Sequence, residues 1–560
     1  MSATDDEKVL ASSALMAAGT VVSRLSGFVR SALLATALGQ QLHADLFTIG
    51  NTIPNMLYIL LAGGVFNAVL VPQLVRAMKH DKDGGDAYTN RIVTLAALFL
   101  GGVSVLLVVA APWVMSIYLS DSFNCADLAP QRDSVIDFAR YCLPQVFFYG
   151  MFVLVGQILN SRGRFGPMMW APIANNVIAV AVLAAYLLVF GPAPQALLNG
   201  PFTAHQELLL GLGSTLGIAV QFLILVPYLK RAGFTFRPRF DFRGTGLGHT
   251  LRLGIWTVLF VVVNQIAYLV VVRLASSGTA AAVGGCGVPP AGEGTGYTVY
   301  SAAFLIVMVP HSIITVSLAT AILPRLSARA AEGDLPGLSR SLSSTLRTAL
   351  VVVVPFALLL PLIASDLANL IWAYGAARSG YDLYTLSLAL FGPGLVFFTV
   401  HYLMLRGFYA LERTRTVFYI QCAVAATNVL AAVVLVGRTD AVHTSPALVV
   451  AYAASYAVGS VVSYFVLRGR LGGLDTLRLV RFLVRMGLAV AVSTAVAYLV
   501  SRGLAGLDDQ PGKLVAAGRV LAITLADAVV FVGAARMLHL TEVTSVIDTV
   551  ARRLPGTRGR

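Results

Sequence analysis

Residues 23–39 read SRLSGFVRSALLATALG and belong to an apolar run from about residue 11 to residue 38. Such a run is long enough to cross a bilayer as a helix, because about 20 apolar residues suffice. It nevertheless carries Arg24 and Arg30. Arg24 lies about 20 Å along the helix from the start of the run, so its side chain does not easily reach the membrane surface. A central arginine costs roughly 2.5–3.5 kcal/mol on insertion scales, so this pair requires a physical reason.

The rest of the chain has the same apolar character. Of its 560 residues, 57% are hydrophobic and 12% are charged, whereas about a quarter of a soluble protein is charged. We therefore predict an all-α polytopic membrane protein with about fourteen spans and no soluble domain. The expected spans lie at roughly 11–38, 44–77, 92–118, 135–160, 168–191, 207–229, 249–275, 297–324, 344–373, 382–411, 416–437, 445–468, 479–501 and 515–537.

The formal net charge is +14, which by itself is also typical of nucleic-acid binding. The basic residues, however, gather in every second predicted loop, and the loops between are poor in them. This distribution follows the positive-inside rule of membrane proteins. We expect both termini in the cytoplasm, the bilayer as a partner, and no nucleic acid.

Two segments resemble each other at an offset of about 250 residues. Residues 53–78 and 309–330 each hold a proline within a span, then small residues, then a second proline. Basic residues follow where the chain leaves the span. The pairs are Pro54 with Pro72, and Pro310 with Pro324, and we expect them to kink or interrupt helices. Both copies begin on the same side of the membrane, which is typical of a parallel repeat with a central cavity between two pseudo-symmetric six-helix lobes. The predicted parts are a first lobe at 1–230, a basic cytoplasmic linker at 231–245, a second lobe at 246–470, two appended helices at 471–540 and a basic cytoplasmic tail at 541–560.

On a helical wheel, Arg24, Gly27 and Arg30 share one arc of the first span with small polar residues, and large aliphatic residues occupy the other arc. One interpretation is a water-filled cavity whose positive potential receives an anion. Guanidinium groups suit phosphate, because their donor fork matches two oxygens. The alternative is an internal ion pair, but Asp45 is the nearest acid in the sequence and cannot neutralise both arginines.

Four cysteines are present. Cys125 and Cys286 fall in two predicted outer loops. Two readings are open: unpaired thiols, or a disulfide on the oxidising side of the membrane.

Several motifs occur in the order SRLSGFVR, ADLFTIGNTIPNMLY, VFNAVLVPQL, LNSRGRF, VPHSIITVSLATAILPRLS and RGFYAL. Together they resemble the MurJ/MviN family of the multidrug/oligosaccharidyl-lipid/polysaccharide exporter superfamily, over essentially the whole chain. The resemblance implies a lipid II flippase. Such a protein carries the undecaprenyl-pyrophosphate-linked disaccharide-pentapeptide from the inner to the outer leaflet for peptidoglycan synthesis, by alternating access.

The resemblance also implies roles for particular residues. Arg24 and Arg30 match the first-helix arginines that meet the pyrophosphate, and Asp45 matches the acid at the start of the second helix. Pro54 and Asn55 match the second helix's Pro-Asn. The expected cavity or gating residues are Asp45, Asn55, Gly27, Pro54 and Pro310. The two appended helices would form a groove for the polyprenyl tail.

The chain departs from the family pattern at three positions: Tyr58 and Leu305 stand where an arginine is frequent, and Gly63 where a glutamate is frequent. The acidic sodium-site residues of some members have no clear match, since this chain has Asn264 in that region. No metal or cofactor is expected.

Two other polar residues lie in the tenth predicted span. His401 is interpreted as a helix-packing or a proton-linked group. Arg406 either lines the cytoplasmic entry or anchors the helix at the interface.

The prediction is therefore a multi-pass protein of the bacterial inner (plasma) membrane that is not an enzyme, with lipid II as its substrate and other cell-wall synthesis proteins as further partners. Two alternatives are kept. One is an exporter of another lipid-linked glycan or a small molecule, and the other is a non-transporting scaffold for cell-wall enzymes.

Overall fold

The computed structural model describes residues 3–60, 85–164, 166–241, 247–506 and 512–545, with side chains from residue 22 onward in the first helix, besides Gly19, and from residue 255 in the helix that begins at 247. Every regular element in these ranges is a helix, with one isolated bridge between Gly285 and Val288. Pro72, Gly63 and most of the predicted tail lie outside the described residues.

The chain divides into two compact units. The first comprises Met1–Thr298, Tyr374–Arg378 and Asp440–Thr444, and the second comprises Val299–Ala373, Ser379–Thr439 and Ser445–Arg560. By packing, the helix at residues 247–283 belongs to the first unit, although the sequence repeat places it in the second copy. A packing unit and a sequence repeat need not coincide, so the division into lobes stays a prediction.

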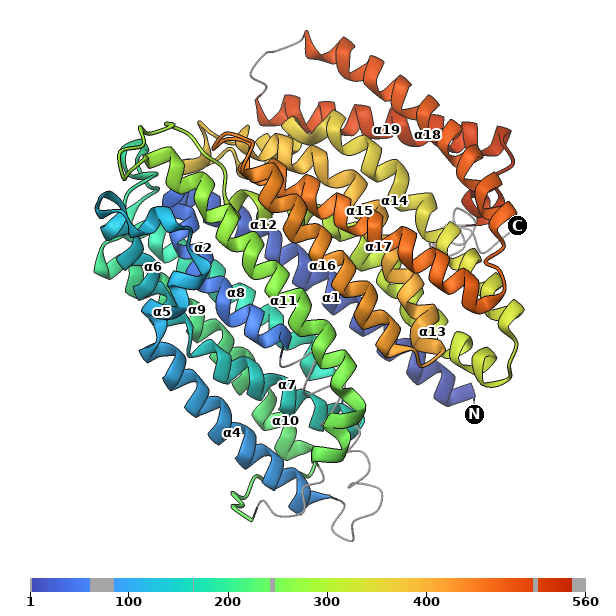
Figure 1. The fold of residues 1–560 in the computed structure, drawn as a ribbon, viewed down its shortest axis with the longest axis horizontal. Helices are drawn as coiled ribbons and strands as arrows, with labels where there is room; N and C mark the ends of the chain where they lie inside the picture. The colour runs from blue at the N-terminus through green and yellow to red at the C-terminus, as the bar shows by residue number, and fades with distance from the viewer. Residues whose placement is uncertain (1–2, 61–84, 165, 242–246, 507–511, 546–560) are drawn as a thin grey trace. The chain divides into compact units, whose positions relative to one another are not determined.

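The first unit holds most of the shorter helices (Figure 1). They are α1 (Ala3–Leu38), α2 (Leu42–Ile59), α4 (Asp86–Val109), α5 (Ala111–Tyr118), η2 (Asp121–Asn124), η3 (Ala126–Leu128), α6 (Ala129–Cys142), α7 (Gln145–Ser161), α8 (Gly166–Phe190), η4 (Gln195–Leu197), α9 (Ala204–Leu223), α10 (Leu225–Arg231), α11 (Leu247–Val283) and η6 (Gly375–Ala377).

The second unit contains α14, the longest helix among the described residues. Its elements are α12 (Tyr297–Pro310, whose first residues belong to the first unit), η5 (His311–Thr315), α13 (Val316–Ala331), α14 (Leu335–Trp372), α15 (Leu383–Ala410), α16 (Thr414–Val436), α17 (Thr444–Leu471), α18 (Thr476–Ala505) and α19 (Lys513–Met537).

Twelve segments of the described residues are long and apolar enough to cross a membrane. They correspond one to one with the third to fourteenth predicted spans, and α1 and α2 lie where the first two were predicted. The all-helical polytopic fold is therefore confirmed. Several boundaries moved by up to about nine residues: α14 begins at Leu335 rather than at about residue 344, and α11 extends to Val283 rather than to about residue 275.

Close helix packing in the first unit depends on glycine. A methyl group at Gly150 of α7 would lie 2.4 Å from Leu100 of α4, and one at Gly211 of α9 would lie 2.6 Å from Tyr141 of α6. The contact at Gly211 is with the Cβ atom of Tyr141, which cannot move without its backbone, so this approach requires glycine, whereas the terminal methyl of Leu100 could rotate away from a side chain at position 150. The buried cluster around Leu100 continues through α7 to Leu225 of α10.

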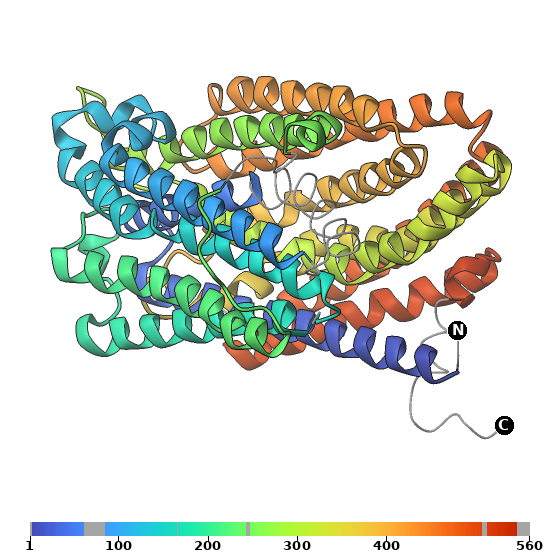
Figure 2. The same cartoon turned by 90° about the horizontal axis from the view of Figure 1, so that it is seen from below.

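In the second unit, α18 and α19 form a hairpin that packs on α14 (Figure 2). The apolar part of this contact joins Leu359 and Ile363 of α14 to Ala497 and Ile523. Two half-buried or buried ion pairs add to it, Arg519 with Asp366 at 3.9 Å and Arg347 with Glu542 at 3.2 Å. The hairpin is thus fixed to α14 by apolar burial and by charge.

Candidate functional site

Arg24 and Arg30 lie on α1, and the side chain of Arg24 is exposed whereas that of Arg30 is partly buried. Within the described part of the chain, neither guanidinium has a hydrogen bond or an ion pair. Gly27 lies one turn from each, and a methyl group there would meet no atom within 4 Å. The arc of α1 that was predicted to face a cavity is therefore cationic and has open space beside it.

The other faces of α1 are occupied differently. Val22, Leu25 and Val29 of the aliphatic arc are exposed, as a lipid-facing surface would be. On α8, the side-chain amide of Asn176 donates to the backbone oxygen of Ser23 at 3.0 Å and to Oγ of Ser26 at 2.8 Å. Ser26 lies off the polar arc because it belongs to this contact with α8 rather than to the cationic face.

Two tyrosines accompany Arg30. Its guanidinium interacts electrostatically with the hydroxyl of Tyr149 on α7, whose ring packs against Tyr58 of α2 with centroids 4.6 Å apart. Tyr58 is the position at which the family pattern favours arginine. The ring contact therefore brings a position at which this chain departs from the family pattern next to the tyrosine that neighbours Arg30. Tyr149 was missed by sequence reasoning, because one tyrosine in an apolar span gives no signal.

Asp45 on α2 is fully buried and is bound to the end of another helix. Its carboxylate accepts hydrogen bonds from the backbone N–H of Thr298 at 2.7 Å and of Tyr297 at 3.1 Å, and from Oγ1 of Thr279 at 2.8 Å. These backbone donors begin α12, where a negative charge is favourable. Asp45 is thus engaged as a cap, and no arginine of the described residues forms an ion pair with it.

The Pro-Asn pair of α2 is divided between two environments. Pro54 is buried within the helix, and Asn55 is exposed. On α11, Asn264 is partly buried, and the amide of the adjacent Gln265 donates to the backbone oxygen of Met56 at 2.8 Å. This contact ties α11 to α2 near the proline.

In the second unit, the helix geometry changes at Pro310. The α-helical pattern of α12 gives way to one π-helical stretch, His311–Thr315, before α13 begins. A π-turn is rare and often marks a functional site. His311 is buried there and pairs through Nδ1 with Oγ1 of Thr399 at 3.1 Å.

The two polar residues of the tenth predicted span lie on α15. His401 is buried, and its Nδ1 pairs with Oγ of Ser463 on α17 at 2.9 Å. The guanidinium of Arg406 lies over the ring of Tyr402, 4.2 Å from its centroid. His401 is thus a contact between two helices, whereas Arg406 rests on an aromatic ring.

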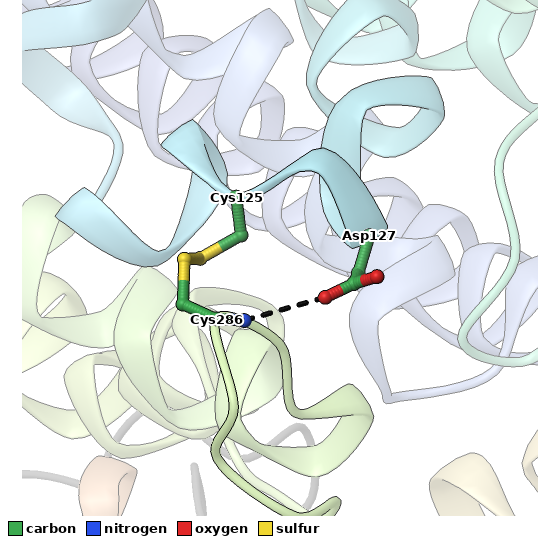
Figure 3. The surroundings of a disulfide bond; sticks show 3 residues. All are labelled: Cys125, Asp127 and Cys286. Atoms are coloured by element: carbon green, nitrogen blue, oxygen red, sulfur yellow. Dashed lines mark hydrogen bonds between the residues drawn. A yellow bond between two sulfur atoms is a disulfide. The ribbon is translucent and has the colours of Figure 1, made fainter.

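A disulfide joins Cys125 to Cys286 in the first unit, with Cα atoms 5.4 Å apart (Figure 3). The backbone N–H of Cys286 also donates to the carboxylate of Asp127 at 3.3 Å. The remaining cysteines, Cys142 and Cys422, are free. The loop that follows α11 is thereby fastened to the loop that follows α5.

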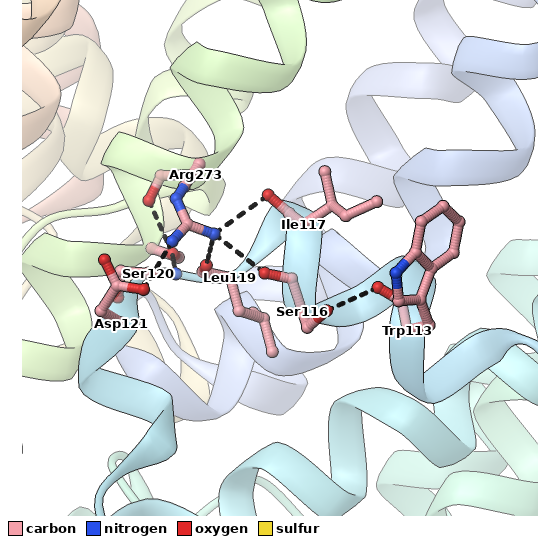
Figure 4. Close-up of polar contacts among 8 residues, drawn as sticks. Trp113, Ser116, Ile117, Leu119, Ser120, Asp121 and Arg273 are labelled. Carbon is pink, nitrogen blue, oxygen red and sulfur yellow. Dashed lines mark hydrogen bonds and ion pairs between the residues drawn. The ribbon is translucent and has the colours of Figure 1, made fainter.

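Arg273 of α11 fastens the same two regions a few residues away (Figure 4). Its guanidinium donates to the backbone oxygens of Ser116, at 2.9 Å, and of Leu119, and it pairs with Asp121 at 2.7 Å. The arginine satisfies carbonyls that the end of α5 leaves without helical partners. Arg273 was not singled out from the sequence, where it is one basic residue at the end of a predicted span.

The candidate residues fall into two sets. The first unit holds Arg24, Gly27, Arg30, Asp45, Pro54, Asn55, Cys125, Asn264 and Cys286, and the second holds Pro310, His401 and Arg406. In the described ranges, no group of three or more His, Cys, Asp or Glu side chains could hold a metal ion.

Comparison with known proteins gives a consistent result. The family model for the lipid II flippase MurJ matches residues 34–506. A probable lipid II flippase MurJ of Haemophilus influenzae is 26% identical over 413 residues, which cover 71% of this chain and 75% of that protein. A lipid II flippase MurJ of Burkholderia cenocepacia is 27% identical over 407 residues, which cover 71% and 72%.

Solved structures agree at the level of the fold. A lipid II flippase MurJ in an inward closed conformation has a TM-score of 0.71 and 16% identity, covering 94% of this chain and 99% of its own. A multidrug resistance MATE family transporter of the MOP superfamily, in an inward-facing conformation, has a TM-score of 0.61 and 16% identity, covering 81% and 96%. Since the family model extends from within α1 to the end of α18, the chain belongs to the lipid II flippase MurJ family.

Proposed function

We propose that this protein is a lipid II flippase, which moves the undecaprenyl-pyrophosphate-linked peptidoglycan precursor from the inner to the outer leaflet by alternating access. The observation that carries this function is the match to the MurJ family over residues 34–506. The relatives in Haemophilus influenzae and Burkholderia cenocepacia, described as lipid II flippases, support it. The protein is accordingly a multi-pass membrane transporter with lipid II as its substrate.

Arg24 and Arg30 capture the pyrophosphate in this proposal. Neither guanidinium group has a hydrogen bond or an ion pair within the described residues, and the space beside Gly27 is open. An unpaired cation in a spanning helix is costly unless a ligand, water or another charge compensates it. A diphosphate supplies the missing charge and accepts the paired donors of a guanidinium.

The protein is expected in the bacterial inner membrane with both termini in the cytoplasm. The basic residues of alternate loops support this orientation. Other cell-wall synthesis proteins are proposed partners. The chemistry is transport rather than catalysis, and binding energy, not a covalent step, drives the capture of the lipid.

The proposed function is tested by complementation in bacterial cells depleted of their own lipid II flippase. Wild-type protein should restore growth, and Arg24→Ala and Arg30→Ala should each fail at equal membrane levels. Arg415→Ala is the matched control, because Arg415 is an exposed arginine of α16 that lies on a tyrosine ring outside this site.

Failure of a correctly inserted wild-type chain would contradict lipid II as the substrate. It would favour export of another lipid-linked glycan, which binding measurements with such lipids would then identify. Rescue by all variants would keep the function and remove the two arginines from the site.

A further inference from the structure

The second unit contains a cation with unused hydrogen-bonding capacity. Arg406 lies in α15, and its guanidinium carbon is 4.2 Å from the ring centroid of Tyr402 and 5.7 Å from that of Tyr409. Its Nε is buried and has no hydrogen-bond partner. No carboxylate among the described residues forms an ion pair with this side chain. A buried donor without a partner is rare in native proteins and requires an explanation.

His311 provides a second polar group beside this arginine. It is the first residue of the π-turn after Pro310, and only 4% of its surface is exposed. Its ring contacts that of Tyr402, with centroids 4.9 Å apart, and Tyr402 is the ring over which the guanidinium of Arg406 lies. Because Nδ1 pairs with Thr399, the Nε2 atom keeps its capacity to donate or accept.

A packing role does not account for both features. A cation that only anchored the helix at the membrane surface would extend to water or to headgroups, as long basic side chains do near helix ends. Here the guanidinium is folded back over the tyrosine one turn earlier in α15. Aromatic faces hold a guanidinium in place and leave its edge donors free for an oxyanion.

The π-turn has a geometric consequence for this cluster. Without an irregularity, each residue after Pro310 would continue the α-helical register. The extra residue of a π-turn rotates the following segment. His311, at the start of this turn, lies against Thr399 and Tyr402 of α15. The proline, the π-turn and the arginine therefore form one local arrangement between η5 and α15.

We propose that Arg406 and His311 form a second oxyanion-binding site, in the second unit, that takes a phosphate group of the transported lipid. This inference rests on the proposed function for the identity of the lipid, but not for the existence of the site. Arg406 supplies charge and donors, and Tyr402 fixes its orientation. Arg406 and Arg30 are alike: each is a cation beside tyrosines in a spanning helix, without a carboxylate partner among the described residues.

The test measures binding of inorganic pyrophosphate to the purified full-length protein in nanodiscs of phosphatidylcholine. Arg406→Gln should weaken binding roughly tenfold, because the loss of one charge-assisted hydrogen bond lowers the affinity by about that factor. Arg406→Lys should be intermediate, because it keeps the charge and loses the fork. Arg415→Gln is the matched control and should stay within about twofold, since Arg415 also lies on a tyrosine, Tyr419.

Several outcomes would overturn the proposal. If Arg406→Gln is folded by thermal melting and binds pyrophosphate as wild type does, Arg406 only anchors the helix. If the folded wild-type protein binds no pyrophosphate, the oxyanion site is wrong, whatever the complementation result. Loss of binding in Arg406→Gln together with failed complementation by wild type would support the site and contradict the proposed function.

A second arm identifies the source of the phosphate. The titration is repeated with undecaprenyl diphosphate, and again in nanodiscs that contain phosphatidylglycerol. Weaker undecaprenyl diphosphate binding by Arg406→Gln in both membranes would support the transported lipid as occupant. If phosphatidylglycerol abolishes the difference between wild type and Arg406→Gln, a bilayer headgroup occupies the site and the assignment to the transported lipid is wrong.

Discussion

The carboxylate of Asp45 accepts a hydrogen bond from the backbone N–H of Thr298 at 2.7 Å, although 253 residues separate them in the chain. Thr298 is the last residue of the stretch Met1–Thr298, which belongs to the first unit. A methyl group on the neighbouring Gly296 would lie 1.9 Å from this carboxylate, so the loop before α12 is shaped around it. The start of α12 is thereby fixed to α2.

Replacing Asp45 by Asn should destabilise the protein by about 2 kcal/mol. The amide keeps one acceptor, but its NH2 group faces the donors that the carboxylate now satisfies. Thermal melting of the purified protein measures the loss. Thr279→Val removes a single donor to the same carboxylate and should cost about 1 kcal/mol. Equal stability of Asp45→Asn and wild type would show that the cap contributes little.

Reduction of the Cys125–Cys286 disulfide should lower the melting temperature. The bond closes a loop of sequence separation 161, and disulfides typically contribute roughly 2–4 kcal/mol. The Cys125→Ser/Cys286→Ser double variant should melt at the same lowered temperature with and without reductant. Alkylation of the unfolded, unreduced protein should label Cys142 and Cys422 only. Four labelled cysteines in protein purified under oxidising conditions would contradict the disulfide.

Arg273→Gln should destabilise the first unit by roughly 2–3 kcal/mol, because several carbonyls and Asp121 lose a charged donor together. Arg273→Lys should be more stable than Arg273→Gln but less stable than wild type, since an ammonium keeps the charge and lacks the planar fork of donors. The matched control is Arg132→Gln. Arg132 pairs with the exposed Asp133 at 3.6 Å, and such surface pairs contribute less than about 1 kcal/mol. Similar losses in both variants would exclude a special role for Arg273.

Much of the fold was predictable because the membrane leaves few choices. Backbone groups in hydrocarbon must be bonded within the segment, so a long apolar run is a helix. The proline at 310 also correctly marked a break in regular α-helix. By contrast, the sequence indicated only a cavity or gating role for Asp45, and its partners at 279 and 297 are too distant in sequence to be inferred.

The residues missed by sequence reasoning share one property. Tyr149, Arg273 and His311 are single polar residues within or beside apolar spans, and each gains meaning only from a neighbour on another helix. Helical periodicity describes one helix at a time and contains no information about which helices meet. The wheel of α1 was informative for the opposite reason, since both arginines lie on one helix.

Acidification should release residues 234–241 of the predicted linker from α4. The hydrogen bond from Arg91 lowers the pKa of Asp241 below its ordinary value of 3.8. The folded-state pKa is the lower one, so the contribution of this pair is complete above about pH 4. It is lost as the pH falls through the lowered pKa. The backbone N–H of Arg237 also donates to Oδ1 of Asn90 on α4, at 2.7 Å. This bond holds the backbone of the linker against α4.

Hydrogen–deuterium exchange of the peptide covering residues 234–241 measures this release. Asp241→Asn should exchange faster than wild type at pH 7, and the two should converge as the pH falls through the lowered pKa of Asp241 and the wild-type carboxylate becomes protonated. Comparison at each pH cancels the intrinsic exchange rates. A constant difference between the two proteins down to the lowest pH would contradict the role of this carboxylate.

The open space beside Gly27 gives the sharpest test of the cationic arc. Gly27→Leu should insert without steric conflict, because no atom lies within 4 Å of the added carbon. The leucine would then occupy the space between Arg24 and Arg30 and hinder a diphosphate that bridges them, so complementation should fail and pyrophosphate affinity should fall. Gly101→Leu is the matched control, since Gly101 of α4 is also helical and has equally open surroundings. If Gly27→Leu complements as well as Gly101→Leu, the anion does not bind against this arc of α1.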